Sequence, residues 1–145
     1  MRISATWQGG RAFTAVGATG FPMQMDATSN YGGKSSAPTP TEMLLSALAG
    51  CIGIDVTMIL KPYLEKLTKL DIKVDGERRE EMPTAFTNIH ITFEVSGEVS
   101  AKKVWRAIKL GEEKYCAVSA SLTAEITHSL ILNGEEVEEE VKAEV

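Results

Sequence analysis

The chain has 145 residues, a hydrophobic content of 43% and a formal net charge of −5, which is typical of one globular domain with its own core. The charge is uneven, because residues 135–145 carry six acidic side chains and one basic, which leaves 14 of each in residues 1–134. A neutral body has no surplus of basic side chains to bind phosphates, so nucleic-acid binding is not expected. We predict a single domain over residues 1–134 and a solvated acidic tail over residues 135–145.

Strand patterns occupy the beginning of the chain. Ile3, Ala5 and Trp7 alternate with polar residues, as in a half-buried strand. The two glycines that follow predict a hairpin turn, with returning strands over residues 12–16 and near residues 23–25. The segment between these strands and residue 40 is rich in Ser, Gly and Pro, and we predict a loop there.

A long apolar helix is predicted to follow this loop. Thr39 is a suitable N-cap, Pro40 suits the first helical position, and Glu42 completes a capping box. Pro62 marks the end of the helix, because proline cannot continue the hydrogen-bond pattern. The helix is apolar on most faces, so we expect it to be buried on most sides.

The same helix raises the question of a membrane. Residues 43–60 contain one charged side chain, Asp55, and reach the length of a membrane span. Gly50, Gly53 and Asp55 suit a packed core helix better, so we expect no membrane contact. Polar residues interrupt the first strand, and no secretory signal is expected. We therefore expect a cytoplasmic location, where thiols are normally kept reduced.

Strands and a second helix alternate in the remainder of the chain. Apolar residues at every second position predict strands over residues 70–75, 89–95 and 122–130. A second helix is predicted over residues 100–115, with one apolar stripe that contains Ala101, Val104, Trp105, Ile108 and Tyr115. Separate runs of strands and helices favour an α+β fold with antiparallel pairing.

The chain has two cysteines, Cys51 within the long helix and Cys116 just after the second helix. Free cysteine is often a small core hydrophobe, and that interpretation stays open for both. Small residues around Cys51 also leave room for a ligand or a second chain, but a reactive thiolate needs a nearby cation to lower its pKa. A zinc site from both cysteines and a histidine is a third alternative. We expect His90 to be exposed and His128 to be a satisfied core histidine.

Two segments resemble motifs of the OsmC/Ohr family, the osmotically inducible and organic hydroperoxide resistance proteins. Residues 40–51 resemble the family's central-helix motif. Residues 113–119 resemble its second-cysteine motif, with Ala117 where proline is usual. The resemblance covers residues 1–132, and residues 55–60 are similar to an OsmC-like branch of small bacterial and archaeal proteins.

The resemblance implies an OsmC-like fold, in which antiparallel sheets wrap around a long buried central helix in an intertwined homodimer. It also implies a thiol-dependent peroxidase that reduces organic hydroperoxides and hydrogen peroxide in oxidative stress defence. Cys51 would be the peroxidatic residue and Cys116 the resolving residue. No bound cofactor or metal is implied, and the disulfide would be reduced by an external dithiol, typically lipoyl-linked.

The family further implies an arginine and a glutamate that activate the peroxidatic cysteine. Arg11 resembles the family's arginine, and Lys34 is an alternative cation. Thr41 stands where peroxidases of the family carry the glutamate, and Glu42 is the remaining carboxylate. The alternative function is therefore a non-catalytic dimer of the same fold that binds a small apolar ligand in its interfacial pocket.

Overall fold

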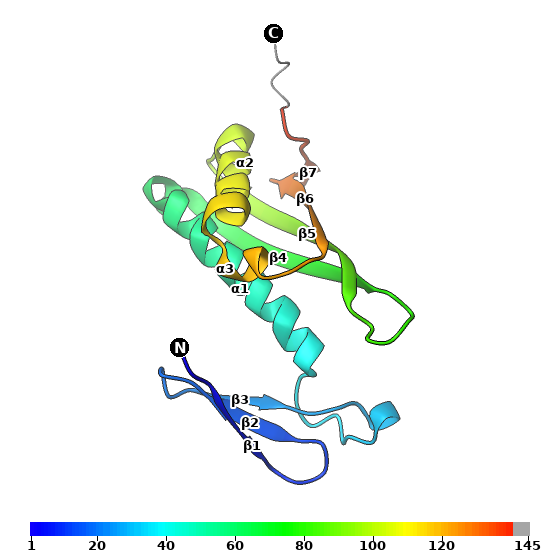
Figure 1. Ribbon diagram of the computed structural model, residues 1–145. Helices are drawn as coiled ribbons and strands as arrows, with labels where there is room; N and C mark the ends of the chain where they lie inside the picture. The colour runs from blue at the N-terminus through cyan, green and yellow to red at the C-terminus, as the bar shows by residue number, and fades with distance from the viewer. Residues whose placement is uncertain (141–145) are drawn as a thin grey trace. The chain divides into compact units, whose positions relative to one another are not determined.

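The computed structural model describes residues 1–140, which form two compact units, residues 1–45 and the residues from Ser46 onward (Figure 1). The predicted α+β class is confirmed, since the described residues combine helices with two separate sheets. The prediction of a single domain over residues 1–134 stays a prediction.

The first unit contains a three-stranded antiparallel sheet in the order β1-β2-β3. All three predicted strands are present: β1 (Ser4–Trp7), β2 (Phe13–Val16) and β3 (Pro22–Met25). The predicted hairpin is also present, and both of its glycines have positive φ angles, 94° at Gly9 and 55° at Gly10. Glycine adopts these angles without the steric penalty that a Cβ atom brings.

The buried carboxylate of Asp26 fixes the loop that precedes the long helix. It accepts hydrogen bonds from the backbone N–H groups of Ala27, Lys34 and Ser36, and from the Ser36 hydroxyl at 2.7 Å. The Ser36 bonds are the main reason that the pKa of Asp26 is lowered. Between these contacts lies a short 3₁₀ helix, η1 (Ser29–Tyr31). The Asp26 side chain therefore joins the two ends of the predicted loop.

The long helix, α1 (Pro40–Ile59), begins with the predicted capping box. The backbone N–H of Thr39 donates to Glu42 Oε2 at 2.7 Å, and the Glu42 N–H donates to Thr39 Oγ1 at 3.3 Å. Pro62 follows the helix end as predicted, within the 3₁₀ helix η2 (Lys61–Lys66). The start and the end of α1 are thus set by local sequence.

The second unit contains a four-stranded sheet in the order β4-β5-β6-β7. Its strands are β4 (Leu67–Arg78), β5 (Phe86–Gly97), β6 (Glu125–Leu132) and β7 (Glu135–Glu136). The prediction of antiparallel pairing is wrong for β5 and β6, which pair in parallel. The segment between them contains a helix and crosses back over the sheet, so β6 starts at the same end as β5.

One face of this sheet carries the core of the second unit. Ile89, Ile91, Phe93 and Val95 of β5 are all buried, as their predicted alternation requires. The helices α1 and α2 (Ala101–Leu110) lie against this face (Figure 1). The opposite face is polar: Glu94 pairs with Lys69 and Lys73, and these bonds lower its pKa to about 2.

The prediction that α1 is buried on most sides is wrong within one chain. Its buried residues are Leu48, Ile52 and Val56, which form a single stripe, whereas Ile54 and Met58 are 63% and 67% exposed. One sheet can cover only one side of a helix, which explains the difference. By length and composition α1 could also cross a membrane, although core helices of soluble proteins pass the same test.

The second helix ends earlier than predicted. After Leu110 the chain forms a π-helical turn, Gly111–Tyr115, in which the Cys116 N–H donates to the Gly111 carbonyl at 2.7 Å. The wider turn breaks the 3.6-residue period, so Tyr115 leaves the predicted apolar stripe and is 54% exposed. A four-residue helix, α3 (Ala117–Ala120), follows Cys116.

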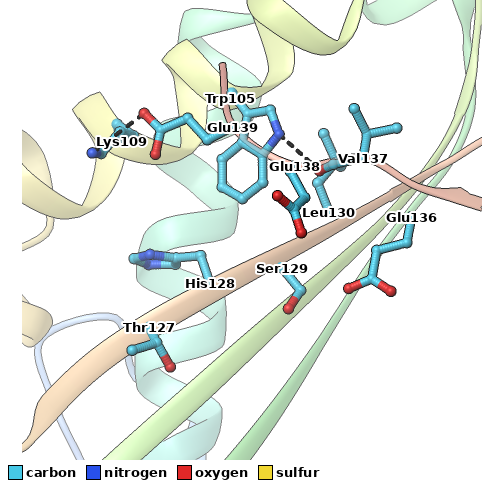
Figure 2. Close-up of a pocket in the computed structure, with 10 residues that line it drawn as sticks. All are labelled: Trp105, Lys109, Thr127, His128, Ser129, Leu130, Glu136, Val137, Glu138 and Glu139. Atoms are coloured by element: carbon cyan, nitrogen blue, oxygen red, sulfur yellow. Dashed lines mark hydrogen bonds and ion pairs between the residues drawn. The ribbon is translucent and has the colours of Figure 1, made fainter. Parts of the chain in front are cut away.

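The predicted acidic tail packs against the second unit at its beginning. Glu135 and Glu136 form β7, and Trp105 Nε1 donates to the Val137 carbonyl at 3.0 Å (Figure 2). Lys109 also lies 3.3 Å from the Glu139 carboxylate. The backbone carbonyl of Val137 provides an anchor that acidic composition alone did not reveal. The end of the predicted tail, residues 141–145, lies outside the described residues.

Candidate active site

The two cysteines of the sequence meet in the second unit. Cys51 lies in the middle of α1, and Cys116 lies between the π-helical turn and α3. Their Sγ atoms and a carboxylate oxygen of Asp55 all lie within 4.8 Å of one another, and both cysteines are free thiols. The fold therefore brings together two thiols that are 65 positions apart in the chain.

The thiol of Cys116 is held firmly from several sides. Cys116 is 2% exposed and serves as the N-cap of α3, because its Sγ accepts a hydrogen bond from the Ser119 N–H at 3.3 Å. The Ser119 hydroxyl in turn donates to the carbonyls of Glu112 and Cys116 at 3.1 and 3.0 Å. These bonds connect the π-helical turn to α3 and leave Cys116 little freedom to move.

Cys51 is half-buried, and its surroundings raise the pKa of its thiol. Burial is the largest cause, followed by the hydrogen bond with the Cys116 thiol, while the negative charge of Asp55 adds to the effect. The backbone N–H of Val118 acts in the opposite direction. A thiol with a raised pKa is mostly protonated at neutral pH, and a thiolate is needed for nucleophilic attack.

Asp55 is the member of this cluster that the sequence analysis missed as a site residue. It follows Cys51 by four residues, so both side chains lie on the same face of α1. Its Oδ2 atom is buried without a hydrogen-bond partner in the described residues. Gly111 is its close neighbour, because a Cβ atom at that position would lie in van der Waals contact with the Asp55 Cβ, at 3.4 Å. The i, i+4 spacing of Cys51 and Asp55 was the available signal.

The predicted activating residues belong to the first unit. The guanidinium of Arg11 lies beside Gly32, where an added Cβ would be 3.6 Å from Nε. The backbone N–H of Lys34 donates to Asp26. Glu42 acts in the capping box, and its hydrogen bonds with the Thr39 N–H and hydroxyl lower its pKa. Roles for Arg11, Lys34 and Glu42 at Cys51 stay predictions.

Neither histidine belongs to the cysteine cluster. Among the described residues, the cysteines and a histidine therefore do not form the zinc site that was one alternative. His90 is not simply exposed: its two ring nitrogens each lie 2.7 Å from a hydroxyl, of Thr127 and of Ser129. His128 is not a satisfied core histidine, because its buried Nε2 has no partner among the described residues. It lines a cavity of about 460 Å³ beside Trp105 (Figure 2), and burial lowers its pKa.

Sequence comparison relates the chain to known proteins. Residues 32–131 match the family model of the OsmC-like proteins. Protein YhfA of Escherichia coli K12 is 38% identical over 132 residues, which cover 89% of this chain and 96% of YhfA.

Two solved structures show a similar fold. One is a putative osmotic stress induced and detoxification response protein from Psychrobacter arcticus, with a TM-score of 0.77 and 20% identity over 91% of this chain and 95% of that one. The other is an organic hydroperoxide resistance protein OsmC, a predicted redox protein, from Legionella pneumophila. It has a TM-score of 0.61 and 13% identity over 91% and 96% of the two chains. Because its sequence matches the family model, it is 38% identical to YhfA and it shares this fold, the chain belongs to the OsmC-like protein family.

Proposed function

We propose that this protein is a thiol-dependent peroxidase that reduces organic hydroperoxides and hydrogen peroxide, with Cys51 as the peroxidatic and Cys116 as the resolving residue. The observation that carries the proposal is the meeting of the two free thiols, whose Sγ atoms lie within 4.8 Å of each other. Membership of the OsmC-like family supports it. So does the likeness in fold to the organic hydroperoxide resistance protein of Legionella pneumophila.

The reaction balances with two thiols and one hydroperoxide. The Cys51 thiolate attacks the distal oxygen of the hydroperoxide, the O–O bond breaks, and the alcohol leaves after it takes up a proton. Cys51 then carries a sulfenic acid. The Cys116 sulfur attacks the Cys51 sulfur, water leaves, and a Cys51–Cys116 disulfide remains. The hydroperoxide has been reduced by two electrons and the thiol pair oxidised by two.

The short distance between the sulfurs favours the second step over other fates of the sulfenic acid. A disulfide needs an S–S length of about 2.05 Å and Cβ atoms roughly 3.5–4.5 Å apart. Cys116 is anchored by α3 and the π-helical turn, whereas Cys51 is the more exposed thiol. The more exposed thiol, Cys51, therefore reacts with the peroxide, and the buried thiol of Cys116 lies next to it.

An external reductant and a second copy of the chain complete the proposed function. An external dithiol, lipoyl-linked in type, returns the disulfide to two thiols by exchange. The active form is a homodimer, because Ile54 and Met58 leave an apolar face of α1 uncovered within one chain. Arg11 and Glu42 are the residues that we propose to activate Cys51. We place the protein in the cytoplasm, where reduced thiols persist.

Turnover with a dithiol tests the function. We expect the protein to consume cumene hydroperoxide catalytically with dihydrolipoamide, and much more slowly with a monothiol, because a dithiol resolves the mixed disulfide intramolecularly. Loss of the hydroperoxide and formation of cumyl alcohol are measured by chromatography. Consumption that does not exceed that of the dithiol alone would contradict the proposal.

A second candidate function is favoured by the raised pKa of Cys51. A thiol that is protonated at neutral pH suits a non-catalytic dimer that binds a small apolar ligand, with its cysteines as packing atoms. The departures at Thr41 and Ala117 point the same way. The two candidates differ in whether Cys51 reacts with peroxide at any pH.

The pH dependence of Cys51 reactivity separates the two candidates. Because the pKa is raised above the ordinary value of 9.0, we expect alkylation of Cys51 by iodoacetamide to accelerate about tenfold per pH unit between about pH 7 and pH 9. Reaction with hydroperoxide should follow the same slope. Peptide mass spectrometry gives the rate at Cys51. A plateau already present at about pH 7 would contradict the raised pKa, and alkylation without any peroxide reaction would favour the ligand-binding candidate.

A further inference from the structure

We propose that Cys51, Asp55 and Cys116 bind a zinc ion when both thiols are reduced. The three ligand atoms lie within 4.8 Å of one another. Zinc holds sulfur at about 2.3 Å and carboxylate oxygen at about 2.0–2.2 Å, which puts tetrahedral ligands roughly 3–4 Å apart. Small side-chain rotations therefore bring all three atoms onto one ion.

The donor set suits zinc better than the hard cations. Two thiolates and one carboxylate are a combination that zinc accepts, whereas magnesium and calcium require oxygen ligands. Cys51 and Asp55 lie one turn apart on α1, and Cys116 approaches from a separate segment that is fixed by α3. Three protein ligands leave a fourth position for water.

A second observation points to a cation in this cluster. Asp55 is half-buried, and its Oδ2 atom is buried and lacks a hydrogen-bond partner in the described residues. A buried polar atom without a partner is costly. A divalent ion among the three groups supplies the missing partner and removes the repulsion between neighbouring negative charges.

Zinc binding is not a redox step. One Zn²⁺ displaces the protons of the Cys51 and Cys116 thiols, so two protons are released and no electrons move. Both sulfurs are then metal ligands and cannot join in a disulfide. The metal-bound and disulfide states of Cys51 and Cys116 exclude each other, so zinc protects the reduced pair from peroxide. This inference goes beyond the proposed peroxidase function and does not depend on it.

Titration of the reduced full-length protein with Zn²⁺ tests the proposal, using a chromophoric chelator as competitor. We expect one zinc per chain, and with Co²⁺ in its place the d–d and thiolate-to-cobalt absorption bands of a tetrahedral thiolate site. Asp55→Asn and Cys51→Ser should each weaken zinc binding by at least about 10–100-fold, the cost of disturbing even outer partners of a metal site. Asp71→Asn is the matched control, because Asp71 is an exposed aspartate on β4, and it should bind zinc like the unchanged protein.

Several outcomes would overturn the zinc site. These are the absence of stoichiometric zinc, a cobalt spectrum without thiolate bands, or Asp55→Asn binding as tightly as the unchanged protein. Circular dichroism checks that each variant is folded. If Asp55→Asn does not fold, the zinc affinity of Cys51→Ser tests the site instead. The titration contains no peroxide. A protein that forms the Cys51–Cys116 disulfide but binds no zinc would therefore contradict only the zinc site, and the reverse result only the peroxidase.

Discussion

Replacing Cys51 with serine abolishes hydroperoxide reduction. The hydroxyl of serine is far less acidic than a thiol and is not ionised near neutral pH, so the nucleophile that attacks the O–O bond is lost. We expect turnover of cumene hydroperoxide with dihydrolipoamide to fall by at least about 1,000-fold. The fold should persist, because the exchange changes one atom in a half-buried position.

Cys116→Ser is the matched control for this prediction, because it removes the other thiol of the same cluster. Serine is a good N-cap and retains an oxygen for the Ser119 N–H. This variant should still consume one equivalent of hydroperoxide and stop as a Cys51 sulfenic acid, which dimedone traps for mass spectrometry. Equal residual activity in the two serine variants would contradict the separate roles of the two cysteines.

Replacing Phe93 with alanine should cause the largest loss of stability. Phe93 lies in the centre of β5 and is fully buried. Truncation removes buried apolar surface and leaves a cavity between rigid elements, which costs about 3–5 kcal/mol for a buried phenylalanine. Urea unfolding followed by circular dichroism measures the change in the free energy of unfolding.

Phe21→Ala is the matched control for the core, because Phe21 is 76% exposed in the first unit. The same chemical change there should cost less than about 0.5 kcal/mol. A loss in Phe93→Ala no larger than that in Phe21→Ala would show that the core does not rest on this face of β5.

Patterns that depend on near neighbours could be predicted from the sequence. The alternation in β5 identified the buried face because side chains on a strand alternate between two sides. The capping box at Thr39 and Glu42 was predictable because both partners lie within one turn. The pairing of Cys51 with Cys116 was implied only by resemblance to a family, since spacing alone left both thiols as core candidates.

Features that depend on distant neighbours were missed. The parallel pairing of β5 with β6 depends on how the intervening helix crosses the sheet, and the exposure of Tyr115 depends on a π-helical turn that a regular period cannot show. In the sequence, Asp55 is simply the one charged side chain of residues 43–60. Asp55 is recognised as a neighbour of two thiols only in the folded chain, where Cys116 lies next to α1.

The most direct test of the thiol pair is peptide mapping after a single turnover. Reduced protein is treated with one equivalent of cumene hydroperoxide without reductant, digested and examined by mass spectrometry. The proposed function predicts one disulfide per chain between Cys51 and Cys116, with an equal amount of cumyl alcohol. Both thiols recovered unmodified after excess hydroperoxide, or cysteines linked only between chains, would contradict it.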